Sequence, residues 1–211
     1  MSNRLVFFGD SITASGKSES LPLGDGYVSM LVDRFSQHTS FSNSIIINSG
    51  INGNTVQDLL IRYKQDVVDY SPQVLLIKIG INDAYNDFIS GINDVNLSRF
   101  RLDYTTLINQ LQKNLPDTQI LLLSPYFIAD NPHEPLYQKM AGYINVVINL
   151  GIDFKFPFLN TQLIFDEAVQ IHEASFWAED QVHPVKAGHE LLAGRVYDFI
   201  LKNSDFKSFK S

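Results

Sequence analysis

The 211-residue sequence contains no cysteine, a single tryptophan and three methionines. The absence of cysteine excludes disulfide frameworks, thiolate metal sites and a cysteine nucleophile. The net charge is −7 and no basic stripe is present, so we expect no nucleic-acid partner, because a phosphate backbone requires clustered Lys and Arg. Near the N-terminus only four apolar residues, Leu5 to Phe8, separate Arg4 from Gly9. This run is too short for a secretory leader or a membrane span, and we expect a cytoplasmic protein that does not bind membranes.

The length and the 45% hydrophobic content predict a single domain over residues 1–211 with a sizeable core. Several apolar runs are hydrophobic at successive positions, which is typical of strands buried on both faces. Amphipathic stretches lie between them, and this alternation predicts an α/β fold, a three-layer α/β/α sandwich around a parallel sheet. The predicted strands are residues 4–9, 44–48, 74–79, 119–124 and 154–159, and the predicted helices are 27–35, 55–69, 100–111, 136–150, 162–172 and 185–202.

Two polar segments rich in Gly, Ser, Asn and Asp, residues 16–26 and 85–98, are predicted to be long loops. Both follow predicted strands. Ligands of open α/β sheets bind outside the carboxyl ends of the strands, so we expect these loops to form the walls of a substrate cleft.

A serine, a histidine and a carboxylate occur in positions that suit nucleophilic catalysis. Ser11 follows the first predicted strand, and Asp180 stands three residues before His183. A serine hydroxyl needs a base within hydrogen-bond reach, and the base needs a third group to orient it. We therefore predict Ser11 as the nucleophile, His183 as the general base and Asp180 as its orienting partner.

Attack on an ester carbonyl places negative charge on the carbonyl oxygen, and this charge requires preorganised donors. We assign the backbone amides of Ser11 and Gly50 and the side-chain amide of Asn82 to this oxyanion hole. A glycine allows the backbone to approach the substrate closely, and asparagine brings an NH₂ donor without charge.

Each of these signals has an ordinary structural alternative. Gly-Asp-Ser is a common turn, Asp180 could cap a helix that begins near Pro184, and Asn82-Asp83 could be a turn pair. Their joint occurrence at strand ends favours catalysis. His172 and His189 each precede a glutamate, but neither completes the zinc-binding H-E-x-x-H pattern, so we expect no metal site.

The motifs GDSIT, GDGYV, GINGNTV, GINDAY and DQVHPVKAGH resemble those of the SGNH or GDSL hydrolases, specifically the bacterial branch of acetylxylan and acetyl-xylooligosaccharide esterases. The resemblance covers nearly the whole chain. It implies a flavodoxin-like fold with five parallel strands, the roles given above for Ser11, Asp180, His183, Gly50 and Asn82, and no metal or organic cofactor. Ala14 replaces the acid of the usual GDSITD motif, and Tyr85 replaces a tryptophan.

The resemblance implies a serine esterase that removes acetyl or other short acyl groups from the hydroxyls of carbohydrates. We assign Asp10, Tyr85 and Trp177 to substrate binding. Tyr126 and Phe127 are further candidates for stacking on a sugar ring, and Asn86 and Asp87 for bonding its hydroxyls. The alternatives are a lysophospholipase or thioesterase of the same superfamily, which would need a long apolar channel, and a non-catalytic carbohydrate-binding protein.

The resemblance to these esterases also implies assembly into dimers or larger rings. The apolar stretch from Val196 to Leu201 offers more hydrophobic surface than one helix face needs. We therefore expect a homo-oligomer.

Overall fold

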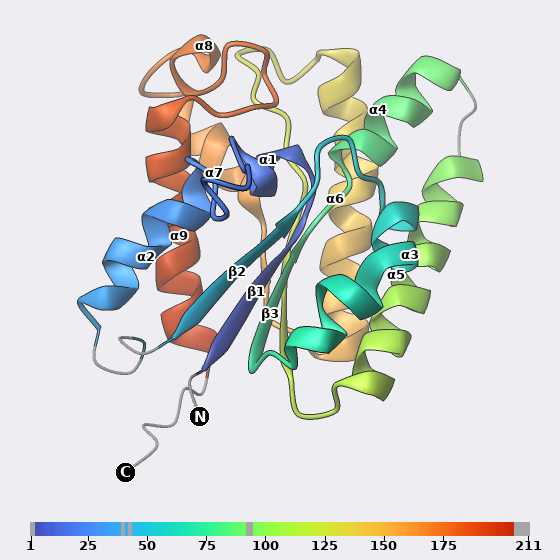
Figure 1. The fold of residues 1–211 in the computed structure, drawn as a ribbon. Helices are drawn as coiled ribbons and strands as arrows, with labels where there is room; N and C mark the ends of the chain where they lie inside the picture. Colours follow the sequence, from blue (N-terminus) through green and yellow to red (C-terminus); the bar gives the residue numbers. More distant parts are fainter. Residues whose placement is uncertain (1–2, 39–40, 42–43, 92–94, 205–211) are drawn as a thin grey trace.

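A computed structural model describes residues 3–38, 41, 44–91 and 95–204 of the chain. Within them, five strands form one parallel sheet in the order β2-β1-β3-β4-β5 (Figure 1). This is the flavodoxin-like order, and it confirms the predicted fold class. The strands are β1 Arg4–Gly9, β2 Ile45–Gly50, β3 Val74–Lys78, β4 Gln119–Leu123 and β5 Phe158–Leu159.

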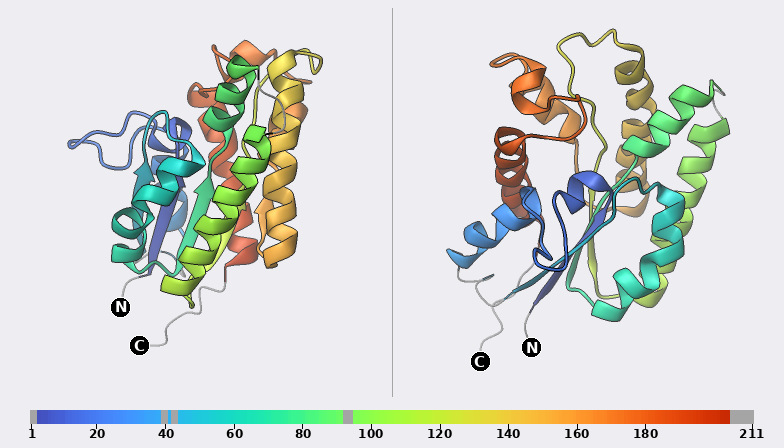
Figure 2. Two further views of the ribbon diagram at one scale, coloured as in Figure 1. Left: turned by 90° about the vertical axis from the view of Figure 1, so that its right-hand side faces the viewer. Right: turned by 45° about the horizontal axis from the view of Figure 1, so that its top comes forward.

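Helices cover both faces of the sheet (Figures 1 and 2). Helices α2 and α9 lie on one face, where α7 contacts α9, and α3, α5 and α6 lie on the other, where α4 contacts α5 and α6. The helices are α1 Ser11–Ala14, α2 Tyr27–Ser36, α3 Val56–Asp66, α4 Ile81–Ser90, α5 Val95–Asn114, α6 Pro135–Phe154, α7 Thr161–Ala168, α8 Ala174–Trp177 and α9 Lys186–Asn203, with a 3₁₀ turn, η1, at Val68–Tyr70.

The central strands are apolar because both of their faces are covered. Leu5 to Phe8 of β1, Val74 to Ile77 of β3 and Ile120 to Leu123 of β4 are almost completely buried. After β1 the chain moves outward to β2 and then returns past β1 to β3, so the direction of winding reverses between β1 and β3. Ligands of doubly wound sheets bind at this reversal, beyond the carboxyl ends of the strands.

The predicted loop over residues 85–98 is wrong. Residues 81–90 form helix α4, which begins after Gly80 at φ 129° and ends at Gly91 at φ 66°. Ile81, Ala84 and Asp87 are buried, whereas Asn86 and Ser90, which suggested a loop, are exposed on the other faces of the helix. Residues 92–94 of the predicted loop lie outside the described residues. The predicted loop over residues 16–26 is confirmed.

The predicted strand boundaries change most at β2 and β5. Strand β2 continues to Gly50, two residues beyond the predicted end, and β5 contains only Phe158 and Leu159. Phe154 belongs to the last turn of α6, which ends at Lys155 in the left-handed conformation.

Candidate active site

Ser11 is the first residue of α1, directly after β1 and the N-capping residue Asp10. Asp10 is fully buried, and its Oδ1 accepts a hydrogen bond from the Ile12 amide at 3.0 Å. Asp10 therefore fixes the turn that presents Ser11, and its burial contradicts the prediction that it binds substrate.

Asp180 and His183 form a self-contained turn before α9. Asp180 Oδ1 accepts the amides of Val182 and His183 at 3.0 and 2.7 Å, and Asp180 Oδ2 lies 2.6 Å from His183 Nδ1. Burial opposes ionisation of this carboxyl, but the hydrogen bonds from the His183 ring and from these two amides outweigh it and lower the Asp180 pKa. An ionised Asp180 accepts the Nδ1 proton, which leaves His183 Nε2 as an acceptor.

The fold brings the three predicted residues together. His183 Nε2 lies 2.8 Å from Ser11 Oγ, although 172 positions separate the two residues in the sequence. In the right-hand view of Figure 2, the blue α1 lies between the orange-red segment that precedes α9 and the green α4. Ser11, His183 and Asp180 thus have the connectivity of a nucleophile, a base and an orienting carboxylate.

The structure contradicts the assignment of Gly50 to an oxyanion hole. The Gly50 amide already donates to Asn48 Oδ1 at 2.9 Å, within the buried end of β2. A side chain at this position would collide with the backbone of Thr13 and Ala14. Gly50 is therefore needed for the close packing of β2 against α1.

The next glycine in the same motif has the properties that Gly50 lacks. Gly53 is exposed at φ 77° in the turn from Ile51 to Asn54, and no atom lies within 4 Å of where its Cβ would be. Among the described residues, the amides of Ser11 and Gly53 have no hydrogen-bond acceptor. Asn82 Nδ2 donates to Asn54 O at 2.9 Å, which ties this turn to the start of α4 and leaves the second N–H of that amide for a ligand.

A cavity of about 250 Å³ adjoins Ser11. Its walls include side chains that the sequence analysis did not select, namely Ser15, Asn52 and His189. Burial lowers the pKa of His189 to about 4, with Asp25 partly opposing the shift. Two motifs in the sequence could have indicated His189 and its neighbour Asp25. GDGYV contains Asp25, and His189 is the last residue of DQVHPVKAGH.

The predicted substrate contacts have different environments. Tyr85 is 49% exposed on α4 and can contact a ligand, whereas Tyr126 and Phe127 are buried, which excludes them from stacking on a sugar. Asp87 is also buried and is held by Lys139, Asn96 and Tyr143. Trp177 donates its indole N–H to the carbonyls of Ala168 and His172, so it ties α8 to the end of α7.

Two further observations concern the described part of the chain. None of its helices combines the length and apolar character of a membrane-spanning segment. Among the same residues, no three His, Asp or Glu side chains come together as a set of metal ligands.

Comparisons with known proteins agree with this geometry. Residues 7–191 match the model of the GDSL-like lipase/acylhydrolase family. The chain is 31% identical over 199 residues to an acetylxylan esterase from Geobacillus stearothermophilus, with 90% of each protein covered. The crystal structure of Axe2, an acetylxylan esterase from that organism, matches with a TM-score of 0.84 at 30% identity and covers 94% of each chain. An alpha/beta hydrolase enzyme from the metagenome of Lake Arreo, Spain, matches with a TM-score of 0.81 at 26% identity, covering 94% of this chain and 96% of that chain.

Proposed function

Because this chain belongs to the GDSL-like lipase/acylhydrolase family, and is thus a carboxylic ester hydrolase, we propose that it deacetylates short carbohydrates such as acetylated xylooligosaccharides. The observation that carries the proposal is the contact chain from Asp180 through His183 to Ser11, at 2.6 and 2.8 Å. A non-catalytic carbohydrate-binding protein would have no reason to keep this arrangement.

In the proposed reaction, Ser11 Oγ attacks the acetyl carbonyl while His183 Nε2 accepts the hydroxyl proton. The ionised Asp180 stabilises the imidazolium that forms. His183 then gives the proton to the leaving sugar oxygen as the ester bond breaks, and an acetyl-serine remains. Water attacks this intermediate by the same route, which releases acetate and restores the Ser11 hydroxyl.

The proposed oxyanion hole consists of the Ser11 and Gly53 amides and the Asn82 side-chain amide. The first two have no acceptor among the described residues, and the third retains one N–H. All three belong to segments that the fold fixes independently of the substrate: the first turn of α1, the Ile51–Asn54 turn and the first turn of α4. Preorganised donors of this kind stabilise the charge of the tetrahedral intermediate without reorganisation during the reaction.

The cavity beside Ser11 favours a sugar over a long acyl chain. It measures about 250 Å³, and Ser15, Asn52 and His189 contribute polar groups to its walls. A lysophospholipase or thioesterase would need an extended apolar channel at this place. The relatives described as acetylxylan esterases support the same choice of substrate.

The direct test is the release of acetate from acetylated xylobiose by the wild type and by Ser11→Ala. We expect turnover by the wild type only. If the folded wild type hydrolyses p-nitrophenyl acetate but deacetylates no sugar, the assignment as an esterase would stand and the carbohydrate substrate would be rejected.

Self-association and a cytoplasmic location remain predictions. The surface used to predict a homo-oligomer is smaller than expected, because Val196 and Ile200 lie in the core and Tyr197, Phe199 and Leu201 pack partly against it. A monomer mass by light scattering at micromolar concentration would contradict self-association.

A further inference from the structure

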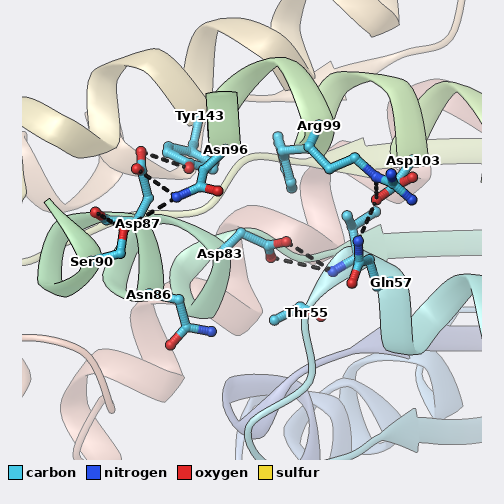
Figure 3. A pocket seen from close by; sticks show the side chains of 12 residues that line it. Thr55, Gln57, Asp83, Asn86, Asp87, Ser90, Asn96, Arg99, Asp103 and Tyr143 are labelled. Carbon is cyan, nitrogen blue, oxygen red and sulfur yellow. Dashed lines mark hydrogen bonds and ion pairs between the residues drawn. The ribbon is translucent and has the colours of Figure 1, made fainter. Parts of the chain in front are cut away.

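A second cavity lies between α4, α5 and the start of α3, with Tyr143 of α6 also in its wall. Its volume is about 310 Å³, at the lower end of the range of about 300 to 1,000 Å³ for small-molecule pockets. The side chains around it are mostly polar and include Gln57, Asp83, Asn86, Ser90, Asn96 and Arg99 (Figure 3).

The carboxylates around this cavity are already held by neighbouring groups. Asp87 is bound by Lys139 at 2.6 Å and by Asn96 and Tyr143 at 3.0 Å each. Although burial opposes ionisation of Asp87, these hydrogen bonds lower its pKa and keep it charged. Figure 3 shows this group on one side of the cavity, with Asp83 between it and a second group around Asp103.

In that second group, Asp103 accepts hydrogen bonds from Arg99 at 2.7 Å and from Gln57 at 2.9 Å. A cation would have to compete with these cationic and amide donors. The fixed amides, carboxylates and hydroxyls instead suit a neutral ligand with many hydroxyl groups, whose donors and acceptors they can match without rearrangement.

The cavity is adjacent to the proposed oxyanion hole. Asn82 binds the Asn54 carbonyl, and the next residue, Asp83, accepts the Val56 amide through its two oxygens at 3.1 and 3.3 Å. The same two residues of α4 therefore hold the chain that separates the catalytic centre from the cavity. Asn86 lies one turn further along α4, and side chains four residues apart on a helix are neighbours, with Cβ atoms about 5 to 6 Å apart.

Asn86 is the group in this cavity that is most available to a ligand. It is exposed, and its amide forms no hydrogen bond with any described residue. Figure 3 shows its side chain apart from the two bonded groups. An unoccupied amide offers a donor pair and an acceptor to the hydroxyls of a sugar.

We propose that this cavity binds a sugar unit next to the one that carries the scissile acetyl group, with Asn86 as a contact that recognises its hydroxyls. The inference rests on the proposed function and names a part of the substrate that the triad does not touch. It follows that the enzyme prefers an acetylated oligosaccharide to an acetylated monosaccharide, because only the longer substrate reaches past Asn82 to Asn86.

The test compares kcat/KM for acetylated xylotriose, acetylated xylose and p-nitrophenyl acetate in the wild type and in Asn86→Ala. Since one neutral hydrogen bond contributes about 0.5 to 1.5 kcal/mol, Asn86→Ala should lower kcat/KM for the trisaccharide by about two- to tenfold, mainly through KM. The other two substrates should change by less than about twofold. Asn86→Trp, which fills the cavity, should give the larger selective loss. Ile89→Ala, an exposed position on the same helix that does not line the cavity, is the matched control.

The outcomes separate this inference from the proposed function. Deacetylation of xylose and xylotriose at equal efficiency, with no selective effect of either Asn86 variant, would overturn the subsite and leave the esterase assignment intact. An equal loss on all three substrates would show that Asn86 supports the helix and does not contact the sugar. Hydrolysis of p-nitrophenyl acetate alone would reject the carbohydrate substrate and the subsite together.

Discussion

His189 Nε2 lies 3.1 Å from Ser15 Oγ, so the cavity beside Ser11 contains a second serine–histidine pair. The Tyr27 amide donates to His189 Nδ1 at 3.2 Å, which places the ring proton on Nε2. Nε2 therefore donates to Ser15 Oγ, and Ser15 donates in turn to Asp25 Oδ1 at 2.8 Å. A histidine that already donates to a serine cannot take its proton, and this pair connects α9 to the 16–26 loop without activating Ser15.

The hydrogen bond between histidine and serine runs in opposite directions in the two pairs, and this predicts which serine is reactive. A fluorophosphonate probe should label Ser11 and leave Ser15 unmodified, as read by peptide mass spectrometry. Ser11→Ala should lower kcat by at least about a thousandfold, because the remaining donors cannot replace a nucleophile. Labelling of Ser15, or loss of labelling in Ser15→Ala but not in Ser11→Ala, would reverse the assignment.

The state of His189 can be observed directly. Its pKa of about 4 predicts a neutral ring with the proton on Nε2 throughout the range in which an exposed histidine titrates. In the unfolded chain the same ring binds a proton below about pH 6.5, so acidification from there towards pH 4 favours the unfolded state. Nitrogen-15 NMR of the ring should show the Nε2–H tautomer at about pH 6, and His189→Gln should weaken the loss of stability in acid. A charged His189 at that pH would contradict this account.

Removal of the Asn82 amide should affect the reaction more than substrate binding. Asn82→Ala is expected to lower kcat by about a hundredfold with little change in KM, since the charge it meets exists mainly in the transition state. Ile89→Ala on the outer face of α4 serves as the control for effects on the helix. A rise in KM alone would make Asn82 a contact of the bound substrate and remove it from the oxyanion hole.

The contacts of the proposed catalytic triad could be predicted from the sequence because local chemistry fixes much of its geometry. Three residues separate Asp180 from His183, and the Asp180 carboxylate caps that same turn, so their contact depends little on the rest of the fold. The contact with Ser11 required the parallel sheet, which the buried apolar strands predicted.

The choice between Gly50 and Gly53 could not be made from sequence. Both belong to the motif GINGNTV, and what distinguishes them is the acceptor of each amide. Gly50 is bound by Asn48, two residues earlier, while the Gly53 amide has no acceptor among the described residues. Helix α4 was also not predicted. Asp83, Asn86 and Ser90 line a polar cavity, and these polar residues interrupt the helical spacing of apolar residues by which a helix is predicted from sequence.

Asp83 should make stability depend on pH. Burial raises its pKa to about 7, and the nearby Asp10 and Asp58 carboxylates add to the shift against the opposing backbone hydrogen bonds. The folded protein thus keeps a proton that the unfolded chain loses near pH 4, and the free energy of unfolding falls as pH rises from about 4 to about 7. Asn at this position keeps an acceptor for the Val56 amide but does not titrate. Urea denaturation of wild type and Asp83→Asn across this range should show a smaller pH dependence in the variant, and equal slopes would contradict the prediction.

Acyl-chain length gives the sharpest test of the site as an acetylesterase. The 250 Å³ cavity beside Ser11 has polar walls, so added methylenes gain little apolar contact and displace water from Ser15, Asn52 and His189. Since one methylene changes transition-state binding by about 1 to 3 kcal/mol, acetyl should be preferred to butyryl by at least about tenfold, and octanoyl should be almost excluded. The measurement is kcat/KM for p-nitrophenyl acetate, butyrate and octanoate, with Ser11→Ala as the background. Faster hydrolysis of the octanoate than of the acetate would require an apolar channel, and the assignment would pass to the lysophospholipase or thioesterase alternative.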